Sequence, residues 1–253
     1  MKKDTSWGNV ADWYKKYLDD PDSYQSQVIL PQLIRLLTIK KGQKILDLAC
    51  GTGFFSEVFQ AQGAEVIGVD IASELIDIAR LHASKDIQFI VSPAHKLGTL
   101  QTQSIDTVVI ILAIQNIKEV KEMLAECKRV LKKDGKITIV MNHPAYRIPG
   151  GSSWEWHEQQ GRQYRRIDAY LSEKTVEISM HPGKDPHTKT VSFHRPIQYY
   201  AKLAHNSGFA ISRIEEWISH KTSEIGPRQK EEDRMRKEIP LFMFLELSQF
   251  GNV

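Results

Sequence analysis

The sequence has very few cysteines and no long apolar run. Only Cys50 and Cys127 are present among 253 residues, which excludes a disulfide framework as the basis of the fold and favours a reducing compartment. No apolar run reaches the roughly 18 residues that a membrane span needs, and the N-terminus has no apolar signal region. These absences predict a cytoplasmic protein without a membrane span.

An excess of charge of one sign is also missing. The chain has 34 Lys and Arg against 31 Asp and Glu, a net charge of +3. Without a clustered basic patch, this charge is too small to indicate a nucleic-acid-binding protein. The hydrophobic content of 41% suits one fairly large globular domain, or a domain with an inserted cap, and argues against a disordered chain.

A short buried strand that runs into a glycine turn is the most informative part of the sequence. Residues 44–55 read Lys-Ile-Leu-Asp-Leu-Ala-Cys-Gly-Thr-Gly-Phe-Phe. The apolar run at 45–48 is typical of a parallel strand buried on both faces, and Gly51 and Gly53 allow the backbone to approach a ligand. Ligands of open α/β sheets bind beyond the carboxyl ends of the strands, so this turn is predicted to be a binding edge.

An acidic residue, Asp70, ends a second apolar run at residues 66–69. It follows the glycines by about 20 residues, the spacing at which dinucleotide-binding proteins carry a carboxylate that binds ribose. The dinucleotide fingerprint also needs a third glycine, and Ser56 stands at that position, so NAD is only weakly supported. The residues predict a nucleotide-like ligand and leave its identity open.

Two segments closely resemble the first two motifs of the class I S-adenosylmethionine-dependent methyltransferases. They are Ile-Leu-Asp-Leu-Ala-Cys-Gly-Thr-Gly-Phe at 45–54 and Gly-Val-Asp-Ile-Ala at 68–72. The resemblance covers residues 41–141 well and a C-terminal hairpin loosely. It implies an α/β fold with a Rossmann-like, seven-stranded, mostly parallel sheet flanked by helices, and S-adenosylmethionine as the cofactor. A cofactor without phosphates needs no cationic cradle, and a carboxylate accepts two hydroxyl hydrogen bonds well.

The same resemblance implies roles for individual residues around the cofactor. It places Asp47 near the methionine end, the glycines along the nucleoside and methionine portions, and Asp70 on both ribose hydroxyls. Many relatives carry an acid where this chain has Ser92, so adenine recognition rests on that hydroxyl, on backbone near Ala94 or on His95, which is otherwise a solvated loop histidine. The predicted cofactor-binding residues are Asp47, Ala49, Gly51, Gly53, Asp70, Ile71, Ala94, His95 and Leu112.

Helical and strand patterns alternate along the rest of the chain. Residues 1–41 are predicted to form an N-terminal helical cover with helices at 10–18 and 24–37, and residues 42–253 to form the main domain. The aromatic residues of the cover are expected either to close over the cofactor or to pack against the sheet, and they are Trp13, Tyr14, Tyr17 and Tyr24. Further strands are predicted at 66–69, 87–91, 105–112, 136–141, 210–218 and 239–247, and helices at 54–62, 73–82, 119–131, 198–206 and within 220–238.

Residues 143–195 interrupt this alternation, and we interpret them as an inserted cap that captures the methyl acceptor. Strands at 175–180 and 190–193 are predicted to pair within the cap. His143 ends the fifth predicted strand and is the candidate catalytic base, with a backbone hydrogen bond at the strand end as its alternative role. The expected walls of an apolar acceptor pocket are Tyr146, Trp154 and Trp156.

Methyl transfer from a sulfonium is a direct displacement and requires no protein nucleophile. The Ala-Ile-Gln-Asn sequence at 113–116 differs from the Asp/Asn-Pro-Pro-aromatic motif of nucleobase amino methyltransferases, and neither cysteine is placed for methylation at pyrimidine C5. We therefore predict a small or medium-sized organic acceptor, no nucleic-acid partner and no metal. The atom that receives the methyl group and the oligomeric state stay open.

Three other classes of protein remain as alternatives. An NAD-dependent oxidoreductase shares the strand, the turn and Asp70 but should carry a glycine in place of Ser56. A noncatalytic regulator that binds the cofactor would keep the glycine motif and need no acceptor pocket. An RNA methyltransferase would present a basic face, whose candidate members are Arg147, Arg162, Arg165, Arg166 and Arg195.

Overall fold

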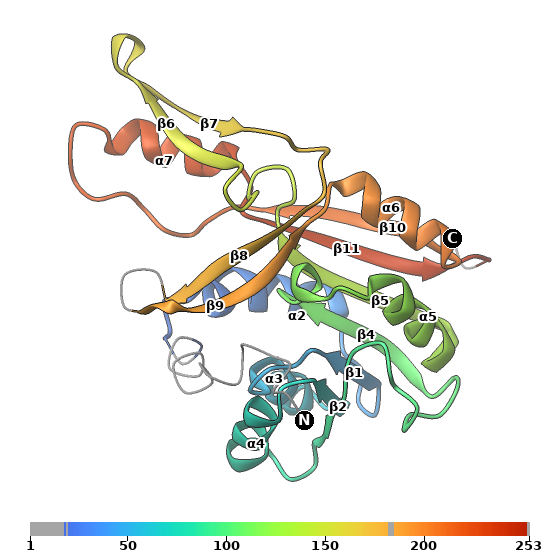
Figure 1. The fold of residues 1–253 in the computed structure, drawn as a ribbon. Helices are drawn as coiled ribbons and strands as arrows, with labels where there is room; N and C mark the ends of the chain where they lie inside the picture. Colours follow the sequence, from blue (N-terminus) through green and yellow to red (C-terminus); the bar gives the residue numbers. More distant parts are fainter. Residues whose placement is uncertain (1–17, 19, 182–184, 252–253) are drawn as a thin grey trace.

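A mixed seven-stranded sheet forms the centre of the molecule (Figure 1). The computed structural model describes residues 18, 20–181 and 185–251. The strand order is β10-β11-β5-β4-β1-β2-β3, in which β11 is antiparallel to both neighbours and every other pair is parallel. This arrangement confirms the predicted fold. The strands of the sheet are β1 (Lys44–Leu48), β2 (Glu65–Asp70), β3 (Gln88–Val91), β4 (Ile105–Ile111), β5 (Leu131–Asn142), β10 (Phe209–Trp217) and β11 (Phe242–Gln249).

Alternate residues of the central strands enter two separate cores. Leu46 of β1 and Val108 of β4 belong to the core on one face, while Ile45 and Val109 belong to the core on the other. Successive side chains of a strand point to opposite faces, so a strand covered on both faces must be apolar at consecutive positions. This explains why the two central strands read as continuous apolar runs.

Helices cover both faces of the sheet. Helices α5 and α6 supply the side chains that bury one face, and α2, α3 and α4 those that bury the other. Pro31 lies in the first turn of α2, directly after the change from the π-helical turn to the α-helix, so it does not interrupt the α-helix. The helices are α2 (Leu30–Leu37), preceded by the π-helical turn η2 (Gln25–Ile29), α3 (Phe54–Ala61), α4 (Ser73–His82), η3 (Ile114–Asn116), α5 (Val120–Val130), η4 (Glu158–Gln160), α6 (Ile197–Asn206) and α7 (Gln229–Glu238).

Some expectations about helices are wrong at their ends or fall outside the described residues. A serine just before an apolar helical pattern favours an N-cap, which predicts that role for Ser73. Ser73 is instead the first residue of α4, and Ala72 holds the N-cap position and donates its N–H to Asp70 Oδ1 at 2.8 Å. The charged helix within 220–238 begins only at Gln229. All but the last residue of the helix expected at 10–18 lies outside the described residues, together with Trp13, Tyr14 and Tyr17.

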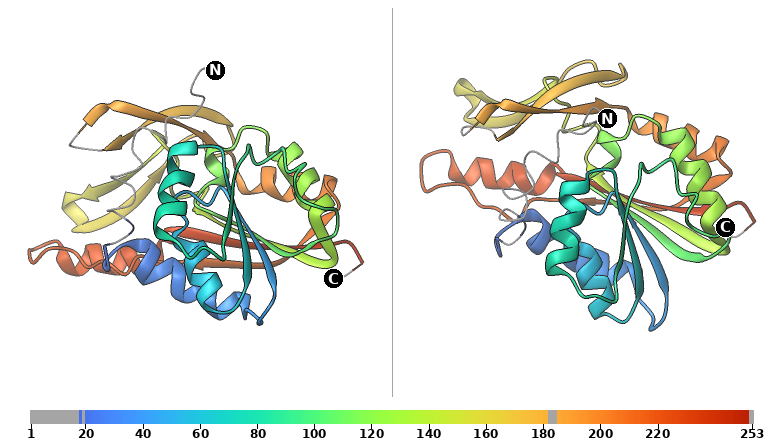
Figure 2. Two further views of the ribbon diagram at one scale, coloured as in Figure 1. Left: turned by 90° about the horizontal axis from the view of Figure 1, so that it is seen from below. Right: turned by 60° about the horizontal axis from the view of Figure 1, so that its bottom comes forward.

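Two antiparallel hairpins follow β5 and lie beyond the carboxyl ends of the parallel strands, and the first of them lies beside α7 (Figures 1 and 2). The second hairpin pairs Thr175 with Phe193, which confirms the pairing predicted within the cap. The first hairpin was not predicted. The hairpin strands are β6 (Ser152–His157), β7 (Arg162–Ile167), β8 (Lys174–His181) and β9 (Asp185–His194). Within the described part of the chain, no helix is both long and apolar enough to cross a membrane.

Candidate functional site

The turn after β1 holds its backbone in conformations that few residues adopt. Ala49, Gly51 and Gly53 have φ angles of 62°, 57° and 81°. A side chain at Gly53 would be strained at this angle, and its Cβ would lie 2.9 Å from Cζ of Phe89. The Cys50 N–H donates to the carbonyl of Val69 at 3.0 Å, which anchors the turn to the neighbouring strand. The turn therefore depends on glycine for both backbone angle and space.

Asp70 ends β2 and joins the turn to the start of α4. Its Oδ2 accepts the N–H of Gly51 at 2.9 Å, and its Oδ1 accepts the N–H of Ala72 at 2.8 Å. Burial raises the pKa of this carboxyl group, and the backbone N–H groups oppose that shift by favouring the charged form. An ionised carboxylate offers about four acceptor positions, so these two bonds leave capacity for two hydroxyl groups.

Asp47 lies within β1 and is buried, with 2% of its surface exposed. The Ser56 hydroxyl donates to Asp47 Oδ2 at 2.6 Å. Burial raises the pKa of Asp47 to about 7, Ser56 opposes the shift, and the negative charge of Asp70 adds to it. Ser56 thus occupies the place of the third dinucleotide glycine and has a function of its own there, because it binds the buried carboxylate.

The two carboxylates make a site suited to a ligand that carries hydroxyl groups and positive charge. No cationic side chain of the described residues contributes to the pKa of Asp47 or Asp70. A positive group of a ligand would therefore be the charge that stabilises their ionised forms. S-adenosylmethionine fits this pair of carboxylates, because its ribose hydroxyls donate hydrogen bonds and its ammonium and sulfonium groups carry positive charge.

The residues expected near adenine lie in the loop that follows β3. The Ser92 hydroxyl donates to the carbonyl of Lys96 at 2.6 Å, so it is used within its own loop. Ala94 is half-buried and packs against the core, and His95 is half-buried with its Nδ1 4.0 Å from Glu119 Oε2. The adenine roles of Ala94 and His95 stay predictions. Ile71, which follows Asp70, is 44% exposed at the edge of the site.

The chain turns sharply where β4 ends. Leu112 has a φ of 53°, an uncommon angle for a residue with a side chain, and its N–H donates to the carbonyl of Val140 at 2.7 Å. The next residues form η3, in which Gln115 and Asn116 each carry a buried amide oxygen that has no hydrogen-bond partner within the described part of the chain. We did not predict these two as site residues.

His143 directly follows β5, which ends at Asn142 and not at His143 as predicted, and the residue is 1% exposed. Its Nε2 lies 2.7 Å from Glu216 Oε1, and its Nδ1 accepts the N–H of Ala145 at 3.2 Å. Burial lowers the pKa of His143, and the Glu216 carboxylate opposes this shift. Since both ring nitrogens have protein partners, these contacts correspond to the alternative structural role. The catalytic role stays a prediction.

The expected pocket walls lie in the first hairpin and in the loop before it. Trp154 is 38% exposed, and the guanidinium of Arg165 lies 5.1 Å from the centre of its ring. The guanidinium of Arg228 lies 4.6 Å from the centre of the Trp156 ring. The carbonyl of Tyr146 accepts a hydrogen bond from Arg165 at 2.8 Å. The contacts described for the two tryptophans therefore join them to arginines, and their role as pocket walls stays a prediction.

Arg195 is not part of a basic face, contrary to what the RNA alternative requires. It is 6% exposed and donates to the carbonyls of Ile117 at 2.9 Å and Lys118 at 3.2 Å. Its guanidinium also lies over the rings of Phe193 and Tyr199, at 4.7 Å and 5.1 Å from their centres. The residue therefore joins the end of β9 to the turn that follows β4.

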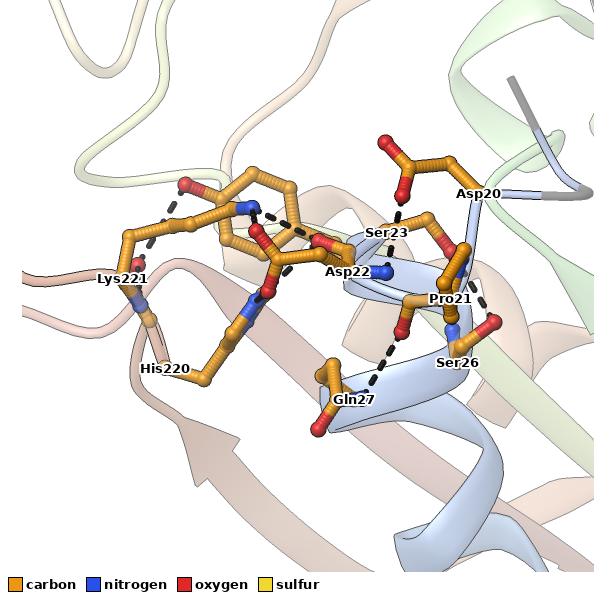
Figure 3. Close-up of polar contacts among 10 residues, drawn as sticks. Asp20, Pro21, Asp22, Ser23, Ser26, Gln27, His220 and Lys221 are labelled. Atoms are coloured by element: carbon orange, nitrogen blue, oxygen red, sulfur yellow. Dashed lines mark hydrogen bonds and ion pairs between the residues drawn. The ribbon is translucent and has the colours of Figure 1, made fainter.

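The N-terminal segment is attached to the loop after β10 by a polar cluster (Figure 3). Asp22 Oδ1 lies 3.0 Å from His220 Nε2, and Asp22 Oδ2 contacts Lys221 Nζ. The Tyr24 ring packs edge-on against His220 and against Phe242, with ring centres 5.2 Å and 5.7 Å apart. For Tyr24, these contacts correspond to packing against the sheet, the alternative to a lid.

Comparisons with known proteins agree with this geometry. Residues 46–139 match a family model described as a methyltransferase domain. Ubiquinone biosynthesis O-methyltransferase of Idiomarina loihiensis is 34% identical over 99 residues, which cover 38% of this chain and 41% of that protein. Demethylmenaquinone methyltransferase of Thermotoga maritima is 32% identical over 111 residues, which cover 43% of this chain and 48% of that protein. The matched region thus spans less than half the length of these curated relatives.

A solved structure extends the similarity of fold to nearly the whole chain. An S-adenosylmethionine-dependent methyltransferase from Mesorhizobium loti superposes with a TM-score of 0.70 at 24% identity, covering 92% of this chain and 100% of that one. The agreement in fold therefore includes the hairpin region that the family model does not reach.

Proposed function

Because the chain belongs to the class I S-adenosylmethionine-dependent methyltransferases, we propose that it transfers the methyl group of S-adenosylmethionine to a small or medium-sized organic acceptor. The observation that carries this proposal is the pair of buried carboxylates, Asp47 and Asp70, on either side of the glycine turn. The bound cofactor supplies an electrophilic methyl group on a sulfonium.

The protein's own groups bind, orient and exclude water. Asp70, already oriented by the N–H groups of Gly51 and Ala72, would accept hydrogen bonds from two ribose hydroxyls. Asp47, held by Ser56, would stabilise the positive charge of the methionine portion. Such orientation lowers the entropic cost of the displacement, because reacting groups held in place need no further ordering.

The acceptor is proposed to bind beyond the carboxyl ends of β4 and β5. Residues 1–41 serve as a cover and residues 143–195 as a cap, with Tyr146, Trp154 and Trp156 as the apolar walls. The two curated relatives are named for ubiquinone biosynthesis and for demethylmenaquinone methylation, which supports an acceptor of the small organic class. Cytoplasmic localisation remains part of the proposal, supported by two unpaired cysteines.

Calorimetry with S-adenosylmethionine, S-adenosylhomocysteine and NAD tests the proposal. The parent should bind the first two and not NAD. Asp70→Ala should lower the affinity at least about tenfold, because it removes a charged acceptor of two hydroxyl hydrogen bonds. Asp77→Ala is the matched control, since its side chain is 72% exposed, and it should bind like the parent. Equal affinity of Asp70→Ala and the parent would show the assignment to be wrong.

A further inference from the structure

An open cleft with a volume of about 280 Å³ lies at the base of the second hairpin, where β8 begins and β9 ends. Its other walls come from Lys118, which lies between η3 and α5, and from Tyr199 in the first turn of α6. Sites for small molecules usually measure roughly 300 to 1,000 Å³, so the cleft suits a small ligand. Among the residues that the structure describes, its lining includes none of those predicted to bind the cofactor or to form the walls of the acceptor pocket.

Positive charge predominates around this cleft. Lys118 and Lys174 are exposed lining residues, and neither ammonium group makes an ion pair with a residue of the described chain. The guanidinium of Arg195, which is 6% exposed, adds a third positive charge. Glu173 is the one acidic side chain among the described lining residues. Three positive groups and one negative group surround the cleft, so an anion would gain favourable electrostatic energy there.

Arg195 and Glu173 offset each other's charge, because both act on the buried hydroxyl of Tyr200. Burial raises the pKa of Tyr200 to about 12, the positive charge of Arg195 opposes this shift, and the negative charge of Glu173 adds to it. Two opposite charges that both act on one hydroxyl lie near enough to attract each other. Lys118 and Lys174 are therefore the charges that a ligand of the cleft is left to neutralise.

The floor of the cleft is fixed by contacts between separate segments. His194 is 4% exposed, and its Nε2 donates to the carbonyl of Tyr170 at 2.8 Å. The hydroxyl of Tyr170 in turn accepts the N–H of Ile197, at the start of α6, at 3.0 Å. Arg195 is held by its hydrogen bonds to carbonyls that follow η3. Because these groups are already ordered, a ligand that binds here pays little further entropy for ordering them.

Arg195 also lies between the cleft and the turn after β4. Its guanidinium lines the cleft, donates to carbonyls of that turn, and lies over the rings of Phe193 and Tyr199, which line the cleft as well. A ligand in the cleft would thus contact the residues that hold the turn. The cleft is in this respect a separate site from the carboxyl edge of the sheet.

We propose that the cleft binds the carboxylate of a small organic molecule that is neither the cofactor nor the methyl acceptor. Lys118 and Lys174 hold the carboxylate as point charges, since an ammonium group binds an anion without a fixed geometry. The half-buried rings of Phe193 and Tyr199 contact the apolar part of the molecule. A ligand that binds only the folded protein also stabilises it.

The test compares benzoate with benzamide, which has nearly the same shape and no charge. Each probe is titrated into the parent protein while NMR follows the dissociation constants. The parent should bind benzoate about tenfold more tightly than benzamide, because the two exposed ammonium groups attract only the anion. Saturating benzoate should also raise the midpoint of thermal unfolding, and benzamide at the same concentration should raise it less.

Substitutions at the cleft should change benzoate affinity in both directions. Lys118→Ala and Lys174→Ala should each weaken benzoate binding about threefold and leave benzamide binding unchanged. Glu173→Gln removes the negative charge and should strengthen benzoate binding about twofold. Lys85→Ala is the matched control, because Lys85 is an exposed lysine between α4 and β3, outside the cleft, and it should bind benzoate like the parent.

Equal affinity of the parent for benzoate and benzamide overturns the proposal, and so does benzoate binding that neither lysine variant weakens. Inorganic phosphate that binds more tightly than benzoate and displaces it would assign the cleft to an inorganic anion, against the proposal. Incubation with benzoate and S-adenosylmethionine should give no methyl benzoate, since a methylated probe would make benzoate an acceptor. None of the titrations needs the cofactor, so a parent that fails to bind S-adenosylhomocysteine refutes the proposed function alone.

Discussion

The two sides of the sheet's carboxyl edge are built in different ways. On the cofactor side, one continuous stretch supplies the turn, and backbone N–H groups of Gly51 and Ala72 hold its central carboxylate. On the proposed acceptor side, Arg195 donates to the carbonyl of Ile117 across a sequence separation of 78 residues, and His143 contacts Glu216 across 73. The first side is local and based on the backbone, whereas the second is assembled from side chains of distant segments.

This difference separates the expected effects of substitutions. Changes on the cofactor side should alter cofactor affinity with little effect on the rest of the fold. Changes on the acceptor side should alter stability and the choice of acceptor but leave cofactor affinity intact. Each prediction below compares the two sides, beginning with the largest expected effect.

Gly53→Val should reduce S-adenosylhomocysteine affinity by at least about a hundredfold. The left-handed backbone angle disfavours a β-branched residue, and the new Cβ would lie 2.9 Å from the Phe89 ring. Calorimetry measures the affinity, and far-UV circular dichroism should stay close to that of the parent. Gly98→Val is the matched control, because a Cβ there meets no atom within 4 Å. If both variants bind like the parent, the glycine turn is not the cofactor site.

Arg195→Met should lower the free energy of unfolding by about 3 kcal/mol, because part-buried carbonyls of the turn after β4 lose their donors. Urea denaturation measures this loss, and S-adenosylhomocysteine affinity should not change. Arg166→Met removes an arginine that is 51% exposed and should stay within about 0.5 kcal/mol of the parent. If Arg195→Met keeps the parent's stability but loses affinity for S-adenosylhomocysteine, Arg195 belongs to the cofactor side and not to the acceptor side.

Asp47→Asn should lower the affinity for S-adenosylmethionine about tenfold at pH 8 and much less at pH 6. Burial holds the pKa of Asp47 at about 7, so its carboxyl group is mostly neutral at pH 6 and charged at pH 8. Positive charge on the cofactor favours the ionised form, and the parent's affinity should therefore rise as pH increases through 7, whereas the variant's should stay flat. Calorimetry at the two pH values measures both profiles. A parallel rise in parent and variant would assign the pH dependence to another group.

Stability gives the opposite pH trend for the same residue. The folded-state pKa of about 7 lies above the ordinary aspartate value of 3.8, so the contribution of Asp47 to stability is present at low pH and is lost as pH rises through 7. Thermal unfolding of the cofactor-free parent should show this loss, and Asp47→Asn should lack it. Ser56→Ala removes the hydrogen bond that favours the charged carboxylate, so it should move both profiles to higher pH.

His143→Asn should have the smallest effect on cofactor affinity, with no measurable change. If His143 is the base, the variant's turnover number should fall most at neutral pH and less at alkaline pH, where the acceptor ionises without help. A fall of the same size at every pH would instead indicate the structural role suggested by Glu216 and Ala145. Steady-state kinetics with an identified acceptor distinguishes the two.

The sequence was sufficient for the local features of this protein. Apolar runs and turn residues predicted the sheet, and the glycines together with Asp70 predicted a cofactor-binding edge. These features can be predicted locally, because a positive φ favours glycine and burial favours apolar residues. The pairing of β8 with β9 was predicted from their alternation. The β6–β7 hairpin was missed, since its strands carry many polar and charged residues and every residue in them is half-buried or exposed.

Only the tertiary structure decided what the distant side chains do. Arg195 was a surface arginine in one interpretation of the sequence and is a buried support of the turn after β4. His143 has the side chain and the sequence position expected of a base, but in the fold its two ring nitrogens contact Glu216 and the N–H of Ala145. The sequence by itself determined the fold and the glycine turn, because those depend on neighbouring residues. The acceptor side depends on contacts between segments more than 70 residues apart, which exist only once the sheet has assembled.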